Sequence, residues 1–441
     1  MPRIVQVFMV LLTGLMMSFY FHPVFFTAYP FYNTKVMLAV LGGGVLVFNT
    51  IRTKDYTLSK GLLNALMIAG VFALVNYISL IINQTEDYSY TSYPVTVLVW
   101  VIGAYGAINF IRWTHHKVTI ELVVRYLAGV GAFHSILSQL IDKNDAVKDI
   151  VTSIFYVSPD MEEMGRLYSF GVALDPSGVR FAVTLIMIAG VLTLSKVVKK
   201  SISLMVFYFL CFVIISVLGN IISRTTTVGM GLGLLIFVLS TGLYKFVIKV
   251  GKIKTMRVLG IVLALGIPLT IYFYNTNASF RDQVEYGFEG FFNFFESGDF
   301  ETGSTDVLAT MWVWPQDNKT WIIGSGVFLS KAGDFTYFSD IGYCRFVFYS
   351  GLIGLTVFGL YFIYNAVHFS IRYPRYKYIF LLMIVVTFVV WTKVATDIFQ
   401  LYALFYAFTD EEELYASDED EEAKELDPIE DESNPALMPQ V

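Results

Sequence analysis

Eleven long apolar runs are the feature that most constrains this chain. A helix needs about 20 mostly apolar residues to cross the hydrocarbon core of a bilayer, and eleven runs reach or approach that length. They span residues 4–21, 36–50, 61–83, 94–111, 118–140, 179–196, 202–222, 226–247, 257–275, 343–368 and 377–393. Another run, 398–408, is too short to cross unaided, so we expect a re-entrant segment or a tilted twelfth span there. The sequence therefore predicts an all-α, polytopic membrane helical bundle of 11–12 transmembrane helices.

Composition supports this class and argues against a soluble protein. Of the 441 residues, 56% are hydrophobic and only 15% are charged, whereas a soluble domain carries about 25% charged residues. Cys211 and Cys344 lie in or beside apolar runs, so we expect no disulfide framework. The first run continues without a small-residue cleavage site, so we interpret it as a retained span.

The runs divide the chain into six parts. These are transmembrane helices 1–5 (1–140), a first extracytoplasmic loop (141–178), helices 6–9 (179–275), a large extracytoplasmic loop (276–342), helices 10–11 with a short apolar segment (343–408), and an acidic tail (409–441). Residues 409–432 hold 14 acidic side chains against one lysine. This composition predicts a solvated, disordered tail with no catalytic role, and the rest of the chain is net positive.

Basic residues alternate between the loops and set the predicted orientation. Those that follow the even-numbered spans are Arg52, Lys54, Lys60, Arg112, Lys117, Lys196, Lys199, Lys200, Lys245, Lys249, Lys252, Lys254, Arg257, Arg372, Arg375 and Lys377. Cytoplasmic loops carry the excess of Lys and Arg in membrane proteins. We therefore expect the N-terminus and these loops to be cytoplasmic.

The large outward loop contains a predicted amphipathic helix. In "FRDQVEYGFEGFFNFFESG" (280–298), aromatic and aliphatic residues recur at helical spacing and acidic residues lie off that stripe. Such a pattern is typical of a helix on a membrane surface. A helix packed against the other spans is an equal alternative. The tryptophans of this loop are also candidates for stacking on sugars.

Five cations are predicted at the outward ends of different spans. They are Arg166, Arg180, Arg224, Arg345 and Lys393. A guanidinium in or near hydrocarbon costs at least ~2.5 kcal/mol, so it usually faces a polar cavity or a partner. Arginine also holds phosphate in a bidentate manner. Five such groups around one outer-leaflet cavity would suit a lipid that bears a diphosphate.

Four of these cations also have a structural alternative. Arg224 or Lys393 could extend to lipid headgroups, and Arg180 could be an interfacial anchor. Arg345 could pair with Asp340, which precedes it by little more than one helical turn.

Other kinds of site have little support in the sequence. The five histidines offer no zinc spacing, and there is no phosphate-binding loop, dinucleotide turn or nucleophile elbow. The outward loops contain no Asp-x-Asp pair, so we expect neither a metal nor a cofactor, and nucleic-acid binding has no support. "GMGLG" (229–233) is interpreted as a site of close helix packing.

Three segments resemble the bacterial O-antigen polymerase (Wzy) family and its kindred O-antigen ligases. "GRLYSFGVALDPSGVRFA" (165–182) is similar to a family segment that precedes a span. "SRTTTVGMGLGLL" (223–235) resembles the family's Ser-Arg turn. "WIIGSGVFLS" and "SDIGYCRFVFYSGLIGL" (321–330 and 339–355) resemble the pattern that closes its large loop. The topology is similar along the whole chain, but the motifs cover only these segments.

The resemblance implies a metal-independent glycosyltransferase of GT-C type at the outer face of the bacterial inner membrane. It would join oligosaccharide repeat units carried on undecaprenyl diphosphate, and a chain-length regulator is a candidate partner. On this interpretation Arg166, Arg224 and Arg345 bind the diphosphate, with Arg180 in support. Asp340 orients or deprotonates the attacking hydroxyl.

The identity of the base and the class of protein both have rivals. Glu285, Glu289, Glu301 and Asp306 are alternatives to Asp340. The large loop holds no histidine, which the related ligases carry there, so a ligase is the second hypothesis. A flippase or exporter of lipid-linked oligosaccharides is the main alternative of another class, although no internal repeat is evident. A structural scaffold would leave the outward arginines unexplained.

Overall fold

The computed structural model describes residues 3–54, 59–158, 161, 166–242, 253–299, 302–328 and 339–409. In this part of the chain nearly all regular structure is helical. The exception is a two-stranded antiparallel sheet of β1 (Phe25–Phe26) and β2 (Tyr29–Asn33). Of the predicted acidic tail only Thr409 belongs to the described residues.

Among the described residues, nine helices are long and apolar enough to cross a membrane, which confirms the predicted all-α membrane class. They are α1 (Arg3–Phe21), α2 (Thr34–Thr53), α3 (Lys60–Asn83), α4 (Tyr93–His115), α5 (Ile120–Lys143), α8 (Leu174–Leu194), α10 (Ile202–Ile222), α12 (Ile253–Thr276) and α17 (Gly342–Arg372). Each coincides with a predicted run, because the thickness of the hydrocarbon core fixes the length of both.

The two remaining predicted spans contain shorter helices, and residues 243–247 of the run 226–247 lie outside the described residues. α11 (Thr226–Thr241) has 16 residues and α18 (Lys377–Val390) has 14. The segment predicted as re-entrant or as a twelfth span contains α19 (Phe399–Tyr406), whose eight residues are all buried. An eight-residue helix rises only ~12 Å, against the ~30 Å of the hydrocarbon core. α19 therefore ends inside the bundle, packed against α4, and does not cross as a regular helix.

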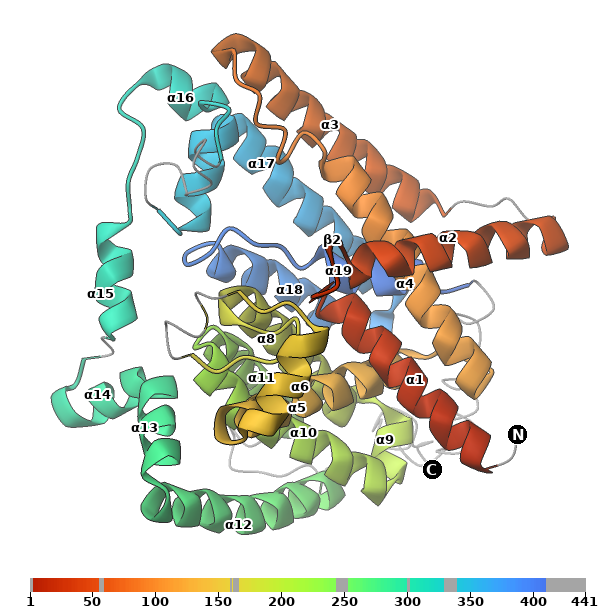
Figure 1. The fold of residues 1–441 in the computed structure, drawn as a ribbon, viewed down its shortest axis with the longest axis vertical. Coiled ribbons are helices and arrows are strands. Elements are labelled where there is room, and N and C mark those ends of the chain that lie inside the picture. Colours follow the sequence, from red (N-terminus) through yellow and green to blue (C-terminus); the bar gives the residue numbers. More distant parts are fainter. Residues whose placement is uncertain are drawn as a thin grey trace, which may run out of the picture.

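Short helices cover one end of the bundle, which we call the loop face. They are α13 (Ala278–Gly287), α14 (Glu289–Ser297), α15 (Gly303–Thr310) and α16 (Asn318–Ile323). In Figure 1 they form the left side of the view, whereas the start of α1 and the end of α2 lie on the right. We call this opposite end the basic end; α9 (Lys196–Lys200) and the start of α12 belong to it. α6 (Asp145–Ile154) and the 3₁₀ helix η4 (Pro374–Tyr376) complete the described helices.

The prediction of one continuous amphipathic helix over 280–298 is wrong, because the structure has two helices there. The chain leaves helical geometry at Phe288 (φ −115°, ψ 18°), which separates α13 from α14. α13 packs against α10 and α12, with Phe280 and Val284 joining the core, as the alternative interpretation proposed. α14 instead leaves Phe295 83% exposed. Two helices with different environments therefore share one stripe of aromatic residues.

Glycine allows close helix packing at two crossings in the bundle. A Cβ added to Gly42 of α2 would collide with the backbone carbonyl oxygen of Ile102 in α4. A Cβ at Gly229 of α11 would collide with the backbone of Ala182 in α8. This confirms the packing interpretation of the 229–233 segment at Gly229, since only a residue without a side chain permits this approach.

The segment after α16 is fixed to the bundle through its backbone. The N–H groups of Ser325 and Gly326 donate to the carbonyl oxygens of Phe348 (2.6 Å) and Tyr349 (3.0 Å) in α17. From α3, Asn83 Nδ2 donates to the carbonyl of Gly324 at 3.0 Å. Residues 324–326 are therefore held against the first turns of α17, where Arg345 lies.

Candidate functional site

A buried polar cluster surrounds Asp397, in the loop between α18 and α19. Asp397 Oδ1 accepts a hydrogen bond from the N–H of Phe399 at 2.9 Å, and Oδ2 accepts one from the Tyr93 hydroxyl at 3.3 Å. Lys35 of α2 and Arg180 of α8 both interact electrostatically with this carboxylate. Four segments that are distant in the sequence thus meet inside the bundle, where Asp397 keeps only a little accessible surface.

Burial controls the protonation of Asp397. Removal of the carboxyl from water raises the pKa of Asp397 above its ordinary 3.8, because a low-dielectric surrounding disfavours the charged form. The hydrogen bonds from Phe399 and Tyr93 act in the opposite direction, as do the charges of Lys35 and Arg180. The net raised pKa shows that desolvation outweighs the partners.

The loop that carries Asp397 is held by the start of α17. Trp391 is fully buried, and its indole N–H donates to the carbonyl of Thr396 at 2.8 Å. The N–H of Tyr343 donates to the carbonyl of Trp391 at 3.1 Å. A Cβ at Gly342 would lie 2.8 Å from the carbonyl oxygen of Val394. Only glycine therefore allows this approach, which places the first turn of α17 beside the 391–398 loop.

Arg180 is the predicted site residue most closely joined to this cluster. Its buried Nε has no hydrogen-bond partner among the residues that the structure describes, although its side chain keeps some accessible surface. Besides Asp397, its charge acts on His22, which follows α1. Burial lowers the pKa of His22 well below its ordinary value, and the charges of His134 and Arg180 lower it further. The neutral His22 adds no counter-charge for Arg180.

Arg345 lies at the start of α17. Its side chain is buried, and its guanidinium carbon lies 3.9 Å from the centroid of the Phe328 ring. It interacts electrostatically with Tyr90 and with Asp340. Tyr90 in turn interacts with Asp397. Tyr90 therefore lies within electrostatic range of both Arg345 and Asp397, whereas the Asp340 side chain is exposed to solvent.

Lys393 is engaged in a structural junction. Its ammonium lies 2.8 Å from Asp175 Oδ1 at the start of α8. The same oxygen accepts hydrogen bonds from Thr225 (2.7 Å) and Ser223 (3.0 Å) in the turn between α10 and α11. Lys393 also donates to the Thr225 hydroxyl at 3.2 Å. These contacts join α8, the α10–α11 turn and the 391–398 loop at the loop face.

Arg224, in the same turn, binds the large loop. It forms an ion pair with Glu289, and its Nε donates to the carbonyl of Tyr286 at 3.0 Å. Its guanidinium carbon lies 4.2 Å from the centroid of the Tyr286 ring. The carboxylate of Glu289 therefore offsets the charge of Arg224, and one of the rival bases is engaged in loop docking.

Arg166 stands apart from these groups. It is exposed, and within the described part of the chain no hydrogen bond or ion pair joins it to the cluster. Of the five predicted cations, the structure thus joins Arg180 to the Asp397 cluster, relates Arg345 to that cluster only through Tyr90, engages Lys393 and Arg224 with carboxylates, and leaves Arg166 outside.

The sequence interpretation missed Lys35 and Asp397. Lys35 immediately precedes the second apolar run at its outward end, so the argument applied to the other outward cations would have found it. Asp397 immediately precedes the short run at 398, and no spacing relates it to Arg180 or Lys35. Only the fold reveals their association.

No group of three or more His, Cys, Asp or Glu side chains that could hold a metal ion occurs among the described residues. Comparisons with protein-family models, curated proteins and solved structures found no match to this chain. The geometry of the buried cluster is thus the basis for a functional hypothesis.

Proposed function

We propose that the chain is a glycosyltransferase, a polysaccharide polymerase that joins oligosaccharide repeat units carried on undecaprenyl diphosphate at the outer face of the bacterial inner membrane. The observation that carries this proposal is the excess of cations around Asp397. Arg180 and Lys35 share this one carboxylate, and the buried Nε of Arg180 has no hydrogen-bond partner in the described structure. A buried excess of positive charge favours an anionic ligand.

A lipid-linked diphosphate fits both the charge and the location. Its lipid would lie in the bilayer, while its phosphates would reach the polar cluster between the spans. The planar fork of Arg180 suits bidentate binding of a phosphate group, and Lys35 supplies a second charge. In a site of low dielectric such preorganised donors stabilise developing charge far more than they would in water.

The proposed reaction needs no further reactant. A hydroxyl oxygen of one repeat unit attacks the anomeric carbon of the growing chain and forms the new glycosidic bond. The bond from that carbon to the diphosphate oxygen breaks, and the electron pair leaves with the lipid diphosphate. The hydroxyl proton passes to a base or to the departing diphosphate. The arginines stabilise the charge of this leaving group.

The proposal assigns different roles to the predicted residues. Arg180 and Arg345 flank the diphosphate, and exposed Asp340 receives the hydroxyl proton from the solvent side. Asp397 positions Arg180 and Lys35. Arg166 would act only if its loop segment carried it toward the cluster. Arg224 would act only if its ion pair with Glu289 opened, so we assign it to loop docking first.

A polymerase assay with purified components tests this proposal. The full chain, reconstituted in liposomes, receives undecaprenyl-diphosphate-linked repeat units, and products are separated on a gel. Wild-type protein should give a ladder of polymer, whereas Arg180→Lys, which keeps the charge but loses the fork, should not. Arg281→Lys is the matched control, because Arg281 is exposed on α13 and lies 3.9 Å from its neighbour Asp282.

The outcomes separate the rival functions. Transfer of preformed polymer to a lipid A acceptor, without a ladder, would identify a ligase. Movement of intact lipid-linked units across the bilayer, without any new glycosidic bond, would identify a flippase and would refute the glycosyltransferase.

A further inference from the structure

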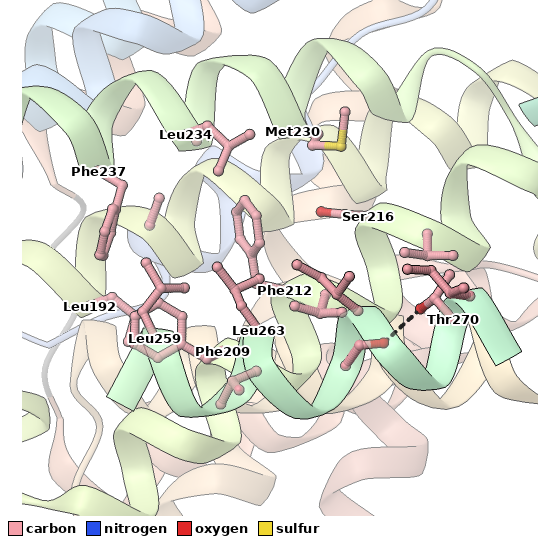
Figure 2. Close-up of a pocket in the computed structure, with 18 residues that line it drawn as sticks. Leu192, Phe209, Phe212, Ser216, Met230, Leu234, Phe237, Leu259, Leu263 and Thr270 are labelled. Carbon is pink, nitrogen blue, oxygen red and sulfur yellow. Dashed lines mark hydrogen bonds between the residues drawn. The ribbon is translucent and has the colours of Figure 1, made fainter. Parts of the chain in front are cut away.

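An apolar cavity of about 360 Å³ lies between α8, α10, α11 and α12. Figure 2 shows its lining, with Phe209 and Phe212 of α10, Leu234 and Phe237 of α11, and Leu259 and Leu263 of α12 around one space. The lining contains no charged side chain. The cavity is therefore a hydrocarbon-like volume within the membrane-spanning region.

Polar groups in the cavity are too few to hold water. The Ser216 hydroxyl is buried and has no hydrogen-bond partner in the described structure. The Thr270 hydroxyl is already used, because it donates to the carbonyl of Gly266 at 2.9 Å within α12. A buried water typically makes about three hydrogen bonds. A hydrocarbon chain is thus a better occupant than water.

The length of the cavity suits one extended chain. Along α12 the lining extends from Leu259 to Ile271, a rise of ~18 Å at 1.5 Å per residue. This exceeds half of the ~30 Å hydrocarbon core. Leu265, on the opposite side of α12, is 71% exposed, whereas Leu263 in the lining is 38% exposed. Ile267 and Ile271 are 52% and 54% exposed, so the cavity is open to the bilayer toward that end. A chain from one leaflet can therefore run along the inner side of α12.

Exposed cations lie where the cavity approaches the basic end. Lys254 and Arg257, both exposed, precede Leu259 at the start of α12. The Lys254 ammonium donates to the carbonyl of Lys200 at 2.9 Å, which brings the end of α9 against α12. Lys200 is exposed as well. Three exposed cations thus lie at the end of the bundle toward which the Leu259 end of the cavity is directed.

We infer that this cavity holds one acyl chain of an anionic phospholipid, whose phosphate lies among Lys200, Lys254 and Arg257. Basic residues near an anionic membrane surface attract its headgroups. The site is separate from the proposed diphosphate cluster. Ala189, which lines the cavity, follows Arg180 by nine residues, and 3.6 residues per turn places the two on opposite faces of α8.

The first experiment measures lipid retention by the purified full chain. The protein in detergent is mixed with phosphatidylglycerol or phosphatidylcholine, and bound lipid is counted by native mass spectrometry. Wild-type protein should retain phosphatidylglycerol preferentially. Leu263→Trp, which fills the cavity, should lower retention roughly tenfold. Leu265→Trp introduces the same side chain on the lipid-facing side of the same helix and should leave retention unchanged. Equal retention by both variants would overturn the inference.

The second experiment tests the headgroup. Lys254→Gln with Arg257→Gln should lower the preference for phosphatidylglycerol roughly tenfold. Arg52→Gln, at the exposed end of α2, removes a charge at the basic end far from the cavity and should have little effect. If the double variant kept the preference for phosphatidylglycerol, the proposed headgroup site would be refuted.

A third measurement does not depend on any variant folding. Phosphatidylglycerol with a photoreactive group on its acyl chain should label cavity-lining peptides of α10, α11 and α12 in wild-type protein. Labelling confined to lipid-facing positions such as Leu265 would show that the chain remains outside the cavity. A negative labelling result would leave the proposed polymerase activity untouched, because the labelling does not depend on the diphosphate cluster.

Discussion

Gly324 and Gly351 each approach the backbone just before the other, where the segment after α16 meets α17. Gly351 has φ 65° and ψ −174°, which interrupts the helix. A Cβ at Gly351 would collide with the carbonyl of Ile322, and one at Gly324 would collide with the carbonyl of Tyr349. Both glycines have positive φ. The contact fixes the segment that follows α16 beside the helix that carries Arg345.

We expect Gly351→Ala to destabilise the protein. The backbone conformation of Gly351 belongs to a region that essentially only glycine adopts, and strain there costs roughly 1–3 kcal/mol. The collision with Ile322 adds to this cost. Thermal unfolding in detergent should therefore show a lower midpoint for Gly351→Ala. Gly260→Ala is the control, because Gly260 lies in α12 with no atom within 4 Å of an added Cβ. Equal midpoints for the two variants would contradict this reading of the contact.

The bundle was largely predictable from the sequence because the bilayer fixes how long an apolar helix must be. α3, for example, differs from its predicted run by one residue. The break at Phe288 was not predictable. Its aromatic stripe continues across both helices, so the hydrophobic pattern gives no sign of the change in direction.

The site was predictable only in part, for a physical reason. Outward cations are conspicuous in the sequence because charge is costly in hydrocarbon. That argument identified Arg180 and Arg345. Their partners depend on tertiary contacts. Nothing local distinguishes Arg224, which pairs with Glu289, from Arg180, whose Nε has no partner in the described structure.

We expect Arg180→Lys to lower the rate of polymerisation. Loss of one preorganised donor to a developing negative charge typically costs a hundredfold to a thousandfold, roughly, in rate. The charge is retained, so the fold should persist, and thermal unfolding of the same sample provides the check. A rate within about twofold of wild type, with the fold intact, would remove Arg180 from the proposed site.

The pH dependence of stability tests the burial of Asp397. Because burial raises the pKa of Asp397 above 3.8, the folded protein binds this proton more tightly than the unfolded chain does. The contribution of Asp397 to stability is therefore present at acid pH and is lost as pH rises through the raised pKa. Asp397→Asn stays neutral. We expect the difference in unfolding midpoint to shift in favour of the Asn variant as pH rises above 3.8. A shift in the opposite direction would show that Lys35 and Arg180 outweigh desolvation.

Lys393→Met tests whether Lys393 is structural or binds the diphosphate. The Lys393–Asp175 pair has side chains only 25% and 29% exposed, so removal of the cation leaves Asp175 partly desolvated with only neutral donors, Ser223 and Thr225. Loss of such a charge-assisted contact costs about 1–3 kcal/mol.

The expected result is a lower unfolding midpoint with an unchanged polymerisation rate per folded molecule. Asp175→Asn combined with Lys393→Met removes both charges and should recover part of the lost stability, because no uncompensated carboxylate then remains. A stable Lys393→Met variant with a large loss of rate would instead place the Lys393 ammonium on the diphosphate. In that case the ion pair with Asp175 would be a resting contact that the substrate replaces.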